Sequence, residues 1–167
     1  MTWFGLIVQG VSANEMFLIE ADTSLPRVFL IGEHEDAYES AIAEHATLLF
    51  SACEMDMELA YSKWVSMLEE MELASESYGL DLKGLKIWLN VFWEKDGSIS
   101  HLAYYLKPIS RNIEVEKLEE FFTEFIATYR FPLVADEKYS HYGTASFPVF
   151  AKVLPSSGSQ GNITNGQ

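Results

Sequence analysis

Residues 85–106 read LKIWLNVFWEKDGSISHLAYYL and contain the clearest secondary-structure signal in the chain. It contains two runs in which alternate residues form two separate rows, as in β-strands, whose successive side chains point to opposite faces of a sheet. Between the runs, Asp96-Gly97 is typical of a tight turn, because glycine readily adopts the positive φ that such turns require. The sequence therefore predicts an antiparallel hairpin over residues 85–106.

The first strand of this hairpin is apolar on both of its faces. One row of alternating residues ends in Trp93, and the other row contains Trp88 and Phe92. A sheet with one side open to water shows polar residues on that side, so we expect both faces of this strand to be covered. The sequence predicts a downstream helix on one face and a pair of N-terminal helices on the other.

Downstream of the hairpin, the pattern predicts a helix and a closing strand. Residues 113–129 place apolar side chains at helical spacing, and Asn112 is a suitable N-cap. Residues 144–153 alternate again and predict a strand. Pro148 has no N–H to donate, which indicates that this strand lies at a sheet edge or contains a bulge. Together with the hairpin, these elements form a ββαβ block with an antiparallel sheet.

Upstream of the hairpin, short apolar runs at residues 16–19 and 27–31 predict strands or extended segments. Two helices are expected at 34–51 and 54–78, and Gly79 is suited to end the second one. The second helix has an apolar stripe that needs a partner: Met57, Tyr61, Trp64, Leu68, Met71 and Tyr78. We therefore predict an α+β fold in which both N-terminal helices pack on the sheet.

Three local features follow one another within residues 85–151. The Asp96-Gly97 turn joins two strands, a helix ends in Tyr129-Arg130-Phe131-Pro132, and the last strand contains Ala145-Ser146-Phe147-Pro148-Val149-Phe150. In this order they resemble the C-terminal domain of TonB-like energy-transducer proteins. The resemblance implies a periplasmic domain that pairs a sheet edge with a peptide of an outer-membrane receptor. That family has a membrane anchor and a Pro/Lys-rich linker before the domain, whereas acidic, largely helical residues precede it here. We therefore expect the fold and strand addition, rather than energy transduction, to be shared.

The charge of the chain is strongly negative and unevenly distributed. The net charge is −14, and residues 1–82 contain sixteen Asp and Glu against two cations, Arg27 and Lys63. Residues 83–167 contain nine charges of each sign. An anionic surface repels phosphate backbones, so we expect no nucleic-acid partner. The acidic half is interpreted either as a solvated face that maintains solubility or as a surface for a basic partner.

The two ends of the chain differ in composition from its centre. Residues 1–13 contain a short apolar stretch and end in Val11-Ser12-Ala13, which is typical either of the end of a signal peptide or of a first buried strand. Residues 155–167 predict a disordered tail, which leaves residues 14–154 as a single domain. No apolar run approaches the ~20 residues of a membrane span. A periplasmic or secreted location and a cytoplasmic one both stay open.

No constellation of residues in the sequence indicates catalysis, a metal or a cofactor. Cys53 is the only cysteine and is expected to be a small packed hydrophobe. The four histidines, His34, His45, His101 and His141, show none of the spacings of metal-binding motifs. We therefore expect a protein that is not an enzyme and that uses neither a metal nor a cofactor.

The leading hypothesis is a non-enzymatic interaction module that binds a protein or peptide partner, including by strand addition. Its expected contact surfaces are the edge of strand 144–153 and the exposed aromatic side chains near Tyr139 and Tyr142, where His141 adds a polar group. The oligomeric state does not follow from the sequence.

The alternative hypothesis is a binding domain for a small molecule or a peptide. Its pocket is expected between the N-terminal helical pair and the sheet, lined by Trp64, Trp88 and Phe92. Such a pocket requires these three side chains to face one another.

Overall fold

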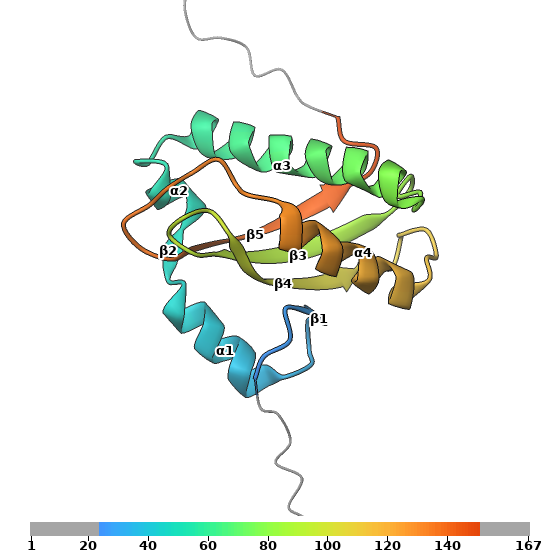
Figure 1. Cartoon of the computed structure of the whole chain (residues 1–167), viewed down its shortest axis with the longest axis horizontal. Helices are drawn as coiled ribbons and strands as arrows, with labels where there is room; N and C mark the ends of the chain where they lie inside the picture. The colour runs from blue at the N-terminus through green and yellow to red at the C-terminus, as the bar shows by residue number, and fades with distance from the viewer. Residues whose placement is uncertain (1–23, 151–167) are drawn as a thin grey trace, which may run out of the picture.

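The computed structural model of the protein describes residues 24–150 and has an α+β fold with one mixed sheet (Figure 1). The strands are β1 (Val28–Leu30), β2 (Thr47–Leu48), β3 (Lys86–Trp93), β4 (Ile99–Leu106) and β5 (Tyr139–Ser146). The helices are α1 (Glu35–Glu44), α2 (Leu49–Ala52), α3 (Met57–Tyr78) and α4 (Val115–Thr128). In space the strands follow the order β1-β4-β3-β5-β2, which makes β3 the central strand.

The hairpin of β3 and β4 is confirmed and forms the centre of the sheet. The strands pair antiparallel from Ile87 to Trp93 of β3, with a register shift between Phe92 and Trp93. Gly97 in the turn has a φ of 81°, a value that glycine reaches without steric cost. β3 has a strand on each side, α3 and α4 cover one of its faces, and α1 covers the part of the other face around Phe92.

The sheet as a whole is mixed, so the prediction of an antiparallel sheet is wrong for its two outer strands. β1, which lies within the predicted segment 27–31, pairs in parallel with β4, and β2 pairs in parallel with β5. The chain between β1 and β2 passes through α1. A crossover through a helix returns the chain to its starting end, so the two strands that it joins run in the same direction.

The predicted helix 34–51 is wrong beyond Glu44. α1 ends there with His45 as its C-cap, and the chain then extends through β2 before the short helix α2. β2 pairs with Tyr139 and Ser140 of β5. The apolar residues up to position 51 have helical spacing, but the pairing of β2 with β5 ends the helix earlier. Local periodicity does not reveal this long-range pairing.

α3 confirms most of the predicted helix 54–78. It begins at Met57 because the Asp56 carboxylate accepts a hydrogen bond of 2.9 Å from the Leu59 N–H, and it ends at Gly79, whose φ is 83°. Its buried residues are Ala60, Trp64, Met67, Leu68, Met71 and Ser75. Met57 and Tyr78, both predicted on the buried stripe, are exposed.

α4 confirms the predicted helix 113–129. It starts after Glu114, so the predicted cap at Asn112 lies two residues too early. The buried residues of α4 are Leu118, Phe121, Phe122, Phe125 and Ile126. The ring of Phe121 lies 5.6 Å from the ring of Tyr78 in α3, so the two helices are neighbours.

The helices are divided between the two faces of the sheet (Figure 1). α3 and α4 lie together on one face, and α1 covers part of the other, where the ring of Tyr38 contacts the ring of Phe92. The prediction that both N-terminal helices pack opposite the downstream helix is therefore wrong for α3. The apolar stripes of α3 and α4 pack against each other as well as on the sheet, which places both helices on the same face.

β5 occupies residues 139–146 rather than the predicted 144–153. It pairs antiparallel with β3 from Tyr139↔Trp93 to Ser146↔Lys86. Residues 147–150 are not part of the strand, and Pro148 lacks the N–H needed to continue a ladder. Four predicted segments lie outside the described residues: 1–13, 16–19, 151–153 and 155–167.

Candidate functional site

β5 presents its side chains alternately to the two faces of the sheet. Tyr139, His141, Gly143 and Ala145 face α3 and α4, and both Tyr139 and Ala145 are buried in the core. The residues between them face the side of α1. β5 therefore contributes side chains to both faces of the sheet.

The outer edge of β5 is mostly free of a neighbouring strand. On its inner side β5 pairs with β3 along its whole length. On its outer side β2 pairs only with Tyr139 and Ser140. From His141 to Ser146, no other strand within residues 24–150 lies on this side.

The hydrogen bonds show which backbone groups of β5 point outward. The Phe147 N–H donates to the Leu85 C=O at 3.0 Å, which continues the ladder between β5 and β3. In an antiparallel ladder every second residue bonds to the same neighbour. The backbone N–H and C=O groups of Tyr142, Thr144 and Ser146 therefore point away from β3, toward the free edge.

The free edge lacks the features that usually block edge pairing. Natural sheets protect exposed edges with charged side chains, prolines or bulges. The sequence from His141 to Ser146 is HYGTAS, which contains no Asp, Glu, Lys, Arg or Pro, and it pairs with β3 without a register shift. α2 also contacts β5, but within the described residues the edge from His141 to Ser146 itself has none of these protective features.

On the α3 side, the free edge is flanked by an aromatic contact. The ring of Trp64 lies 4.5 Å from the ring of His141, and burial lowers the pKa of the His141 imidazole. A Cβ at Gly143 would lie 2.8 Å from His141 Nε2 and 3.1 Å from the Trp64 ring. Glycine at this position therefore allows the tryptophan to approach the strand closely.

On the opposite side, aromatic side chains form an exposed platform beside the edge. The rings of Trp88 and Tyr142 stack at 5.4 Å with an angle of 3° between their planes, and Lys107 Nζ lies 4.3 Å from the Trp88 ring centre. Tyr142 is 54% exposed, and Tyr105, which pairs with Trp88 across the hairpin, is 45% exposed. We call Trp88, Tyr105 and Tyr142 the aromatic platform.

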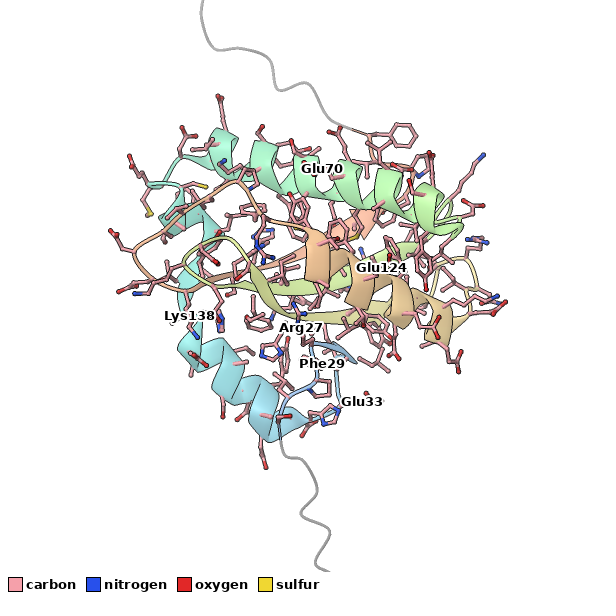
Figure 2. All side chains as sticks on the ribbon, in the orientation of Figure 1. Arg27, Phe29, Glu33, Glu70, Glu124 and Lys138 are labelled. Atoms are coloured by element: carbon pink, nitrogen blue, oxygen red, sulfur yellow. The ribbon has the colours of Figure 1, made fainter. Side chains whose placement is uncertain are left out.

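α1 covers the remainder of that face. Asn90 Nδ2 donates to the Tyr38 hydroxyl at 3.0 Å, and the Phe92 ring contacts the rings of Tyr38 and His45. Lys138 forms ion pairs with Glu44 of α1 and Glu94, beside the C-terminal end of α1 (Figure 2). The hydrogen bond to Lys138 lowers the pKa of the Glu44 carboxyl. These contacts attach α1 to the sheet and leave the aromatic platform uncovered by it.

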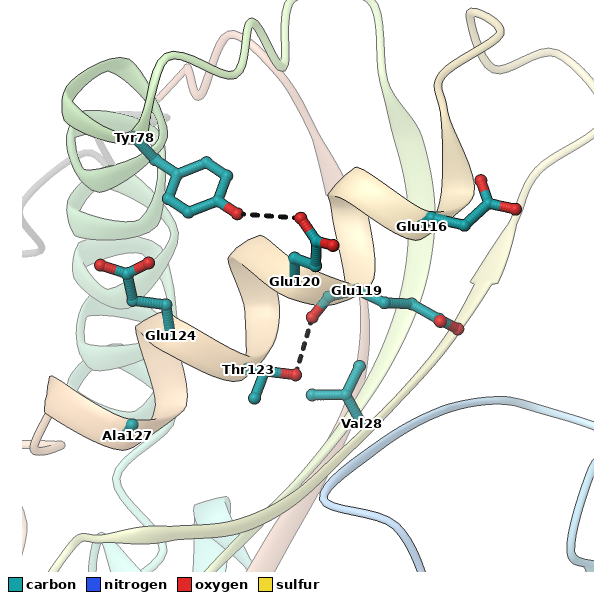
Figure 3. Close-up of a pocket in the computed structure, with 8 residues that line it drawn as sticks. All are labelled: Val28, Tyr78, Glu116, Glu119, Glu120, Thr123, Glu124 and Ala127. Atoms are coloured by element: carbon teal, nitrogen blue, oxygen red, sulfur yellow. Dashed lines mark hydrogen bonds between the residues drawn. The ribbon is translucent and has the colours of Figure 1, made fainter.

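An acidic groove lies along α4, away from the edge of β5 (Figure 3). Its lining residues are Val28, Tyr78, Glu116, Glu119, Glu120, Thr123, Glu124 and Ala127. Within it, the Tyr78 hydroxyl donates to Glu120 at 3.4 Å and Thr123 donates to the backbone C=O of Glu119 at 2.8 Å. Burial and a hydrogen bond to the Glu119 carboxylate raise the pKa of Tyr104 beneath the groove. The groove contributes to the negative surface of the protein.

The structure brings the predicted site residues together in two pairs. Trp64 lies against His141 on one face, and Trp88 stacks on Tyr142 on the other. Tyr139 is fully buried, and its hydroxyl donates to the Leu133 C=O at 3.1 Å. Phe92 is also buried, beneath α1. Trp64 and the pair of Trp88 and Phe92 thus lie on opposite faces of the sheet and do not line one pocket.

Sequence reasoning missed three residues of the site: Tyr105, Lys107 and Gly143. A partial signal existed for Tyr105, because alternation along the return strand of the hairpin separates it from the buried row. Its pairing with Trp88 does not follow from the turn, since the loop spans three residues between Glu94 and Ser98 and the register shifts between Phe92 and Trp93. No comparable signal existed for Gly143, since its role depends on where α3 lies.

No family model matches the chain, and no similar curated protein or solved structure was found. The resemblance to a TonB-like domain therefore stays a prediction. None of the helices within residues 24–150 is long and apolar enough to cross a membrane.

Proposed function

We propose that the protein is a non-enzymatic interaction module that binds an extended segment of a protein or peptide partner by strand addition at β5. The observation that supports this most directly is the unpaired edge from His141 to Ser146, with outward backbone groups at Tyr142, Thr144 and Ser146. In strand addition, main-chain hydrogen bonds provide the affinity and the surfaces that flank the edge provide the specificity. It is also the binding mode that the TonB-like resemblance implies.

The two sides of the edge offer different surfaces to the side chains of an added strand. Successive side chains of that strand alternate between the side of α3 and the side of the aromatic platform. Tyr142 projects from β5 itself and is half exposed, so it lies beside the nearest partner side chains that face the platform. Aromatic and apolar side chains are favoured there, because aromatic surfaces contribute large contact areas at interfaces.

The test uses synthetic heptapeptides, acetylated and amidated, in which valine alternates with lysine, serine or glutamate. We expect at least one of them to shift the NMR amide signals of Tyr142, Thr144 and Ser146. Thr144→Pro removes one outward N–H and leaves the ladder with β3 intact. Each main-chain hydrogen bond contributes about 1 kcal/mol, and the proline ring also obstructs the edge, so we expect the affinity to fall by about tenfold.

Thr144→Val is the matched control, because it keeps the N–H and changes only the side chain. Its affinity is expected to stay within about twofold of the wild type. If Thr144→Pro does not fold, peptides N-methylated at alternate residues test the same hydrogen bonds from the partner's side. Unchanged binding by the proline variant or by the methylated peptides would contradict strand addition, as would the failure of all three peptides to shift these amides.

A further inference from the structure

α3 runs alongside the free edge of β5. Near one end of the edge, the ring of Trp64 lies 4.5 Å from the ring of His141. Just beyond the other end, the Glu72 carboxylate accepts a hydrogen bond of 2.9 Å from the Val149 N–H. Figure 1 shows the helix and the strand following the same direction. A strand added to β5 therefore lies beside one flank of α3.

This flank of α3 is acidic. Residues three or four positions apart share a helix face, and Glu72 marks the face that points to the end of β5. The same face contains Glu58, Tyr61, Val65, Glu69, Glu72 and Glu76, which we call the acidic stripe. Glu58, Glu69 and Glu76 are exposed, whereas Lys63, the one lysine of α3, donates to the Pro132 C=O on the other flank.

We infer that the partner segment is cationic, with lysine or arginine at the alternate positions that face α3 and apolar residues at the positions between them. This inference rests on the proposed strand addition and specifies its partner. Long cationic side chains can cover apolar surface with their aliphatic stems while their charged ends stay in water. Tyr61 and Val65 are half-buried and offer such a surface between Glu58 and Glu69. The apolar positions of the partner face the aromatic platform.

A second copy of this chain does not meet these requirements. Pairing two β5 edges around a twofold axis brings the same surface of each copy together. The two acidic stripes would then lie beside each other, and each chain also has a net charge of −14. Like charges placed opposite one another across an interface are unfavourable. A basic partner instead neutralises the stripe.

The peptides described above test this inference directly. At low ionic strength we expect the lysine-valine heptapeptide to bind at least about tenfold more tightly than the serine-valine heptapeptide, and the glutamate-valine heptapeptide to bind more weakly than either. The double variant Glu58→Gln/Glu69→Gln is expected to weaken binding of the lysine peptide by about three- to tenfold, since exposed charge pairs contribute modestly. It should also reduce the dependence of this affinity on salt.

The matched control is Glu116→Gln/Glu120→Gln on α4, which removes the same charge far from the edge and should change the affinity by less than about twofold. Three outcomes would overturn the inference: equal binding of the serine and lysine peptides, an equal effect of both double variants, or a dimer in sedimentation experiments with its β5 amides protected. If the serine and lysine peptides bind equally and Thr144→Pro weakens both, strand addition stands and the cationic specificity fails. If Thr144→Pro binds both peptides as tightly as the wild type does, strand addition and the cationic specificity are both contradicted.

Discussion

His141 is held against the Trp64 ring, where burial lowers the pKa of its imidazole below the ordinary value of 6.5. Because the folded protein disfavours the protonated ring, the unfolded chain binds more protons just below this pH. The free energy of unfolding therefore contains a contribution that is fully present above pH 6.5 and is lost as the pH falls toward the folded-state pKa.

We expect the wild type to lose stability relative to His141→Gln between about pH 7.5 and about pH 5. Urea unfolding at a series of pH values measures this, and the difference between the two proteins is the informative quantity. The many carboxylates titrate in both proteins and cancel in that difference. A difference that stays constant over the range would contradict a pKa lowered by burial.

Trp88 and Tyr142 illustrate what can be predicted about single residues of the site. Their aromatic character marked both as candidates, but their contact depends on register. Tyr142 pairs with Asn90, next to Trp88 on the same face, so the two rings are diagonal neighbours. A strand placed at residues 144–153 leaves Tyr142 outside the sheet, and the stack could not be foreseen from it.

Among the helices and strands, the sequence predicts those that are marked by a local pattern of residues. The β3–β4 hairpin has alternation and a turn, and α3 and α4 have long apolar stripes with suitable ends. β2 is two residues long, too short for a period of two to be visible. The predicted start of β5 is five residues too late, because Phe147, Val149 and the residues after them also alternate and only Pro148 argues against a strand there.

The N-terminal cap of α3 is a second local signal, and its contribution can be measured. Asp56→Ala removes the carboxylate that accepts from the Leu59 N–H, so we expect the free energy of unfolding to fall by about 1 kcal/mol. Chemical denaturation monitored by circular dichroism gives this value. Asp56→Asn is the control, since asparagine caps helices about as well, and equal stability of Asp56→Ala and the wild type would argue against the cap.

At the scale of the whole molecule, the sheet has packed layers on both sides. Phe92 is fully buried although it faces away from α3 and α4, because the rings of Tyr38 in α1, His45 at its C-cap and His101 in β4 surround it. The apolar rows of β3 indicate coverage of both faces, and the structure shows it except at the aromatic platform. The rows do not indicate which helix covers which face. The apolar stripe of each helix could pack on either face of the sheet, and the choice depends on how the helices pack against one another.

Removing the Phe92 side chain, which α1 packs against, should lower the stability of the protein strongly. Phe92→Ala is expected to lower the free energy of unfolding by about 3–5 kcal/mol, the usual cost for a buried phenylalanine. Tyr105→Ala, on the same face but exposed, should cost less than about 1 kcal/mol. Urea unfolding gives both values, and hydrogen exchange should show faster opening of α1 than of α3 in Phe92→Ala. An equal acceleration of hydrogen exchange in α1 and α3 would contradict the view that α1 forms a layer that opens separately from α3.

The crossing from β1 through α1 to β2 has a consequence for synthesis on the ribosome. β1 pairs with β4, and β2 pairs with the first residues of β5. β1 and β2 therefore leave the ribosome long before the strands with which they pair have been synthesised. Chains dominated by such distant pairings fold slowly and expose apolar surface meanwhile. The many carboxylates of the first half keep that nascent portion hydrated until Tyr139 and Ser140 leave the exit tunnel.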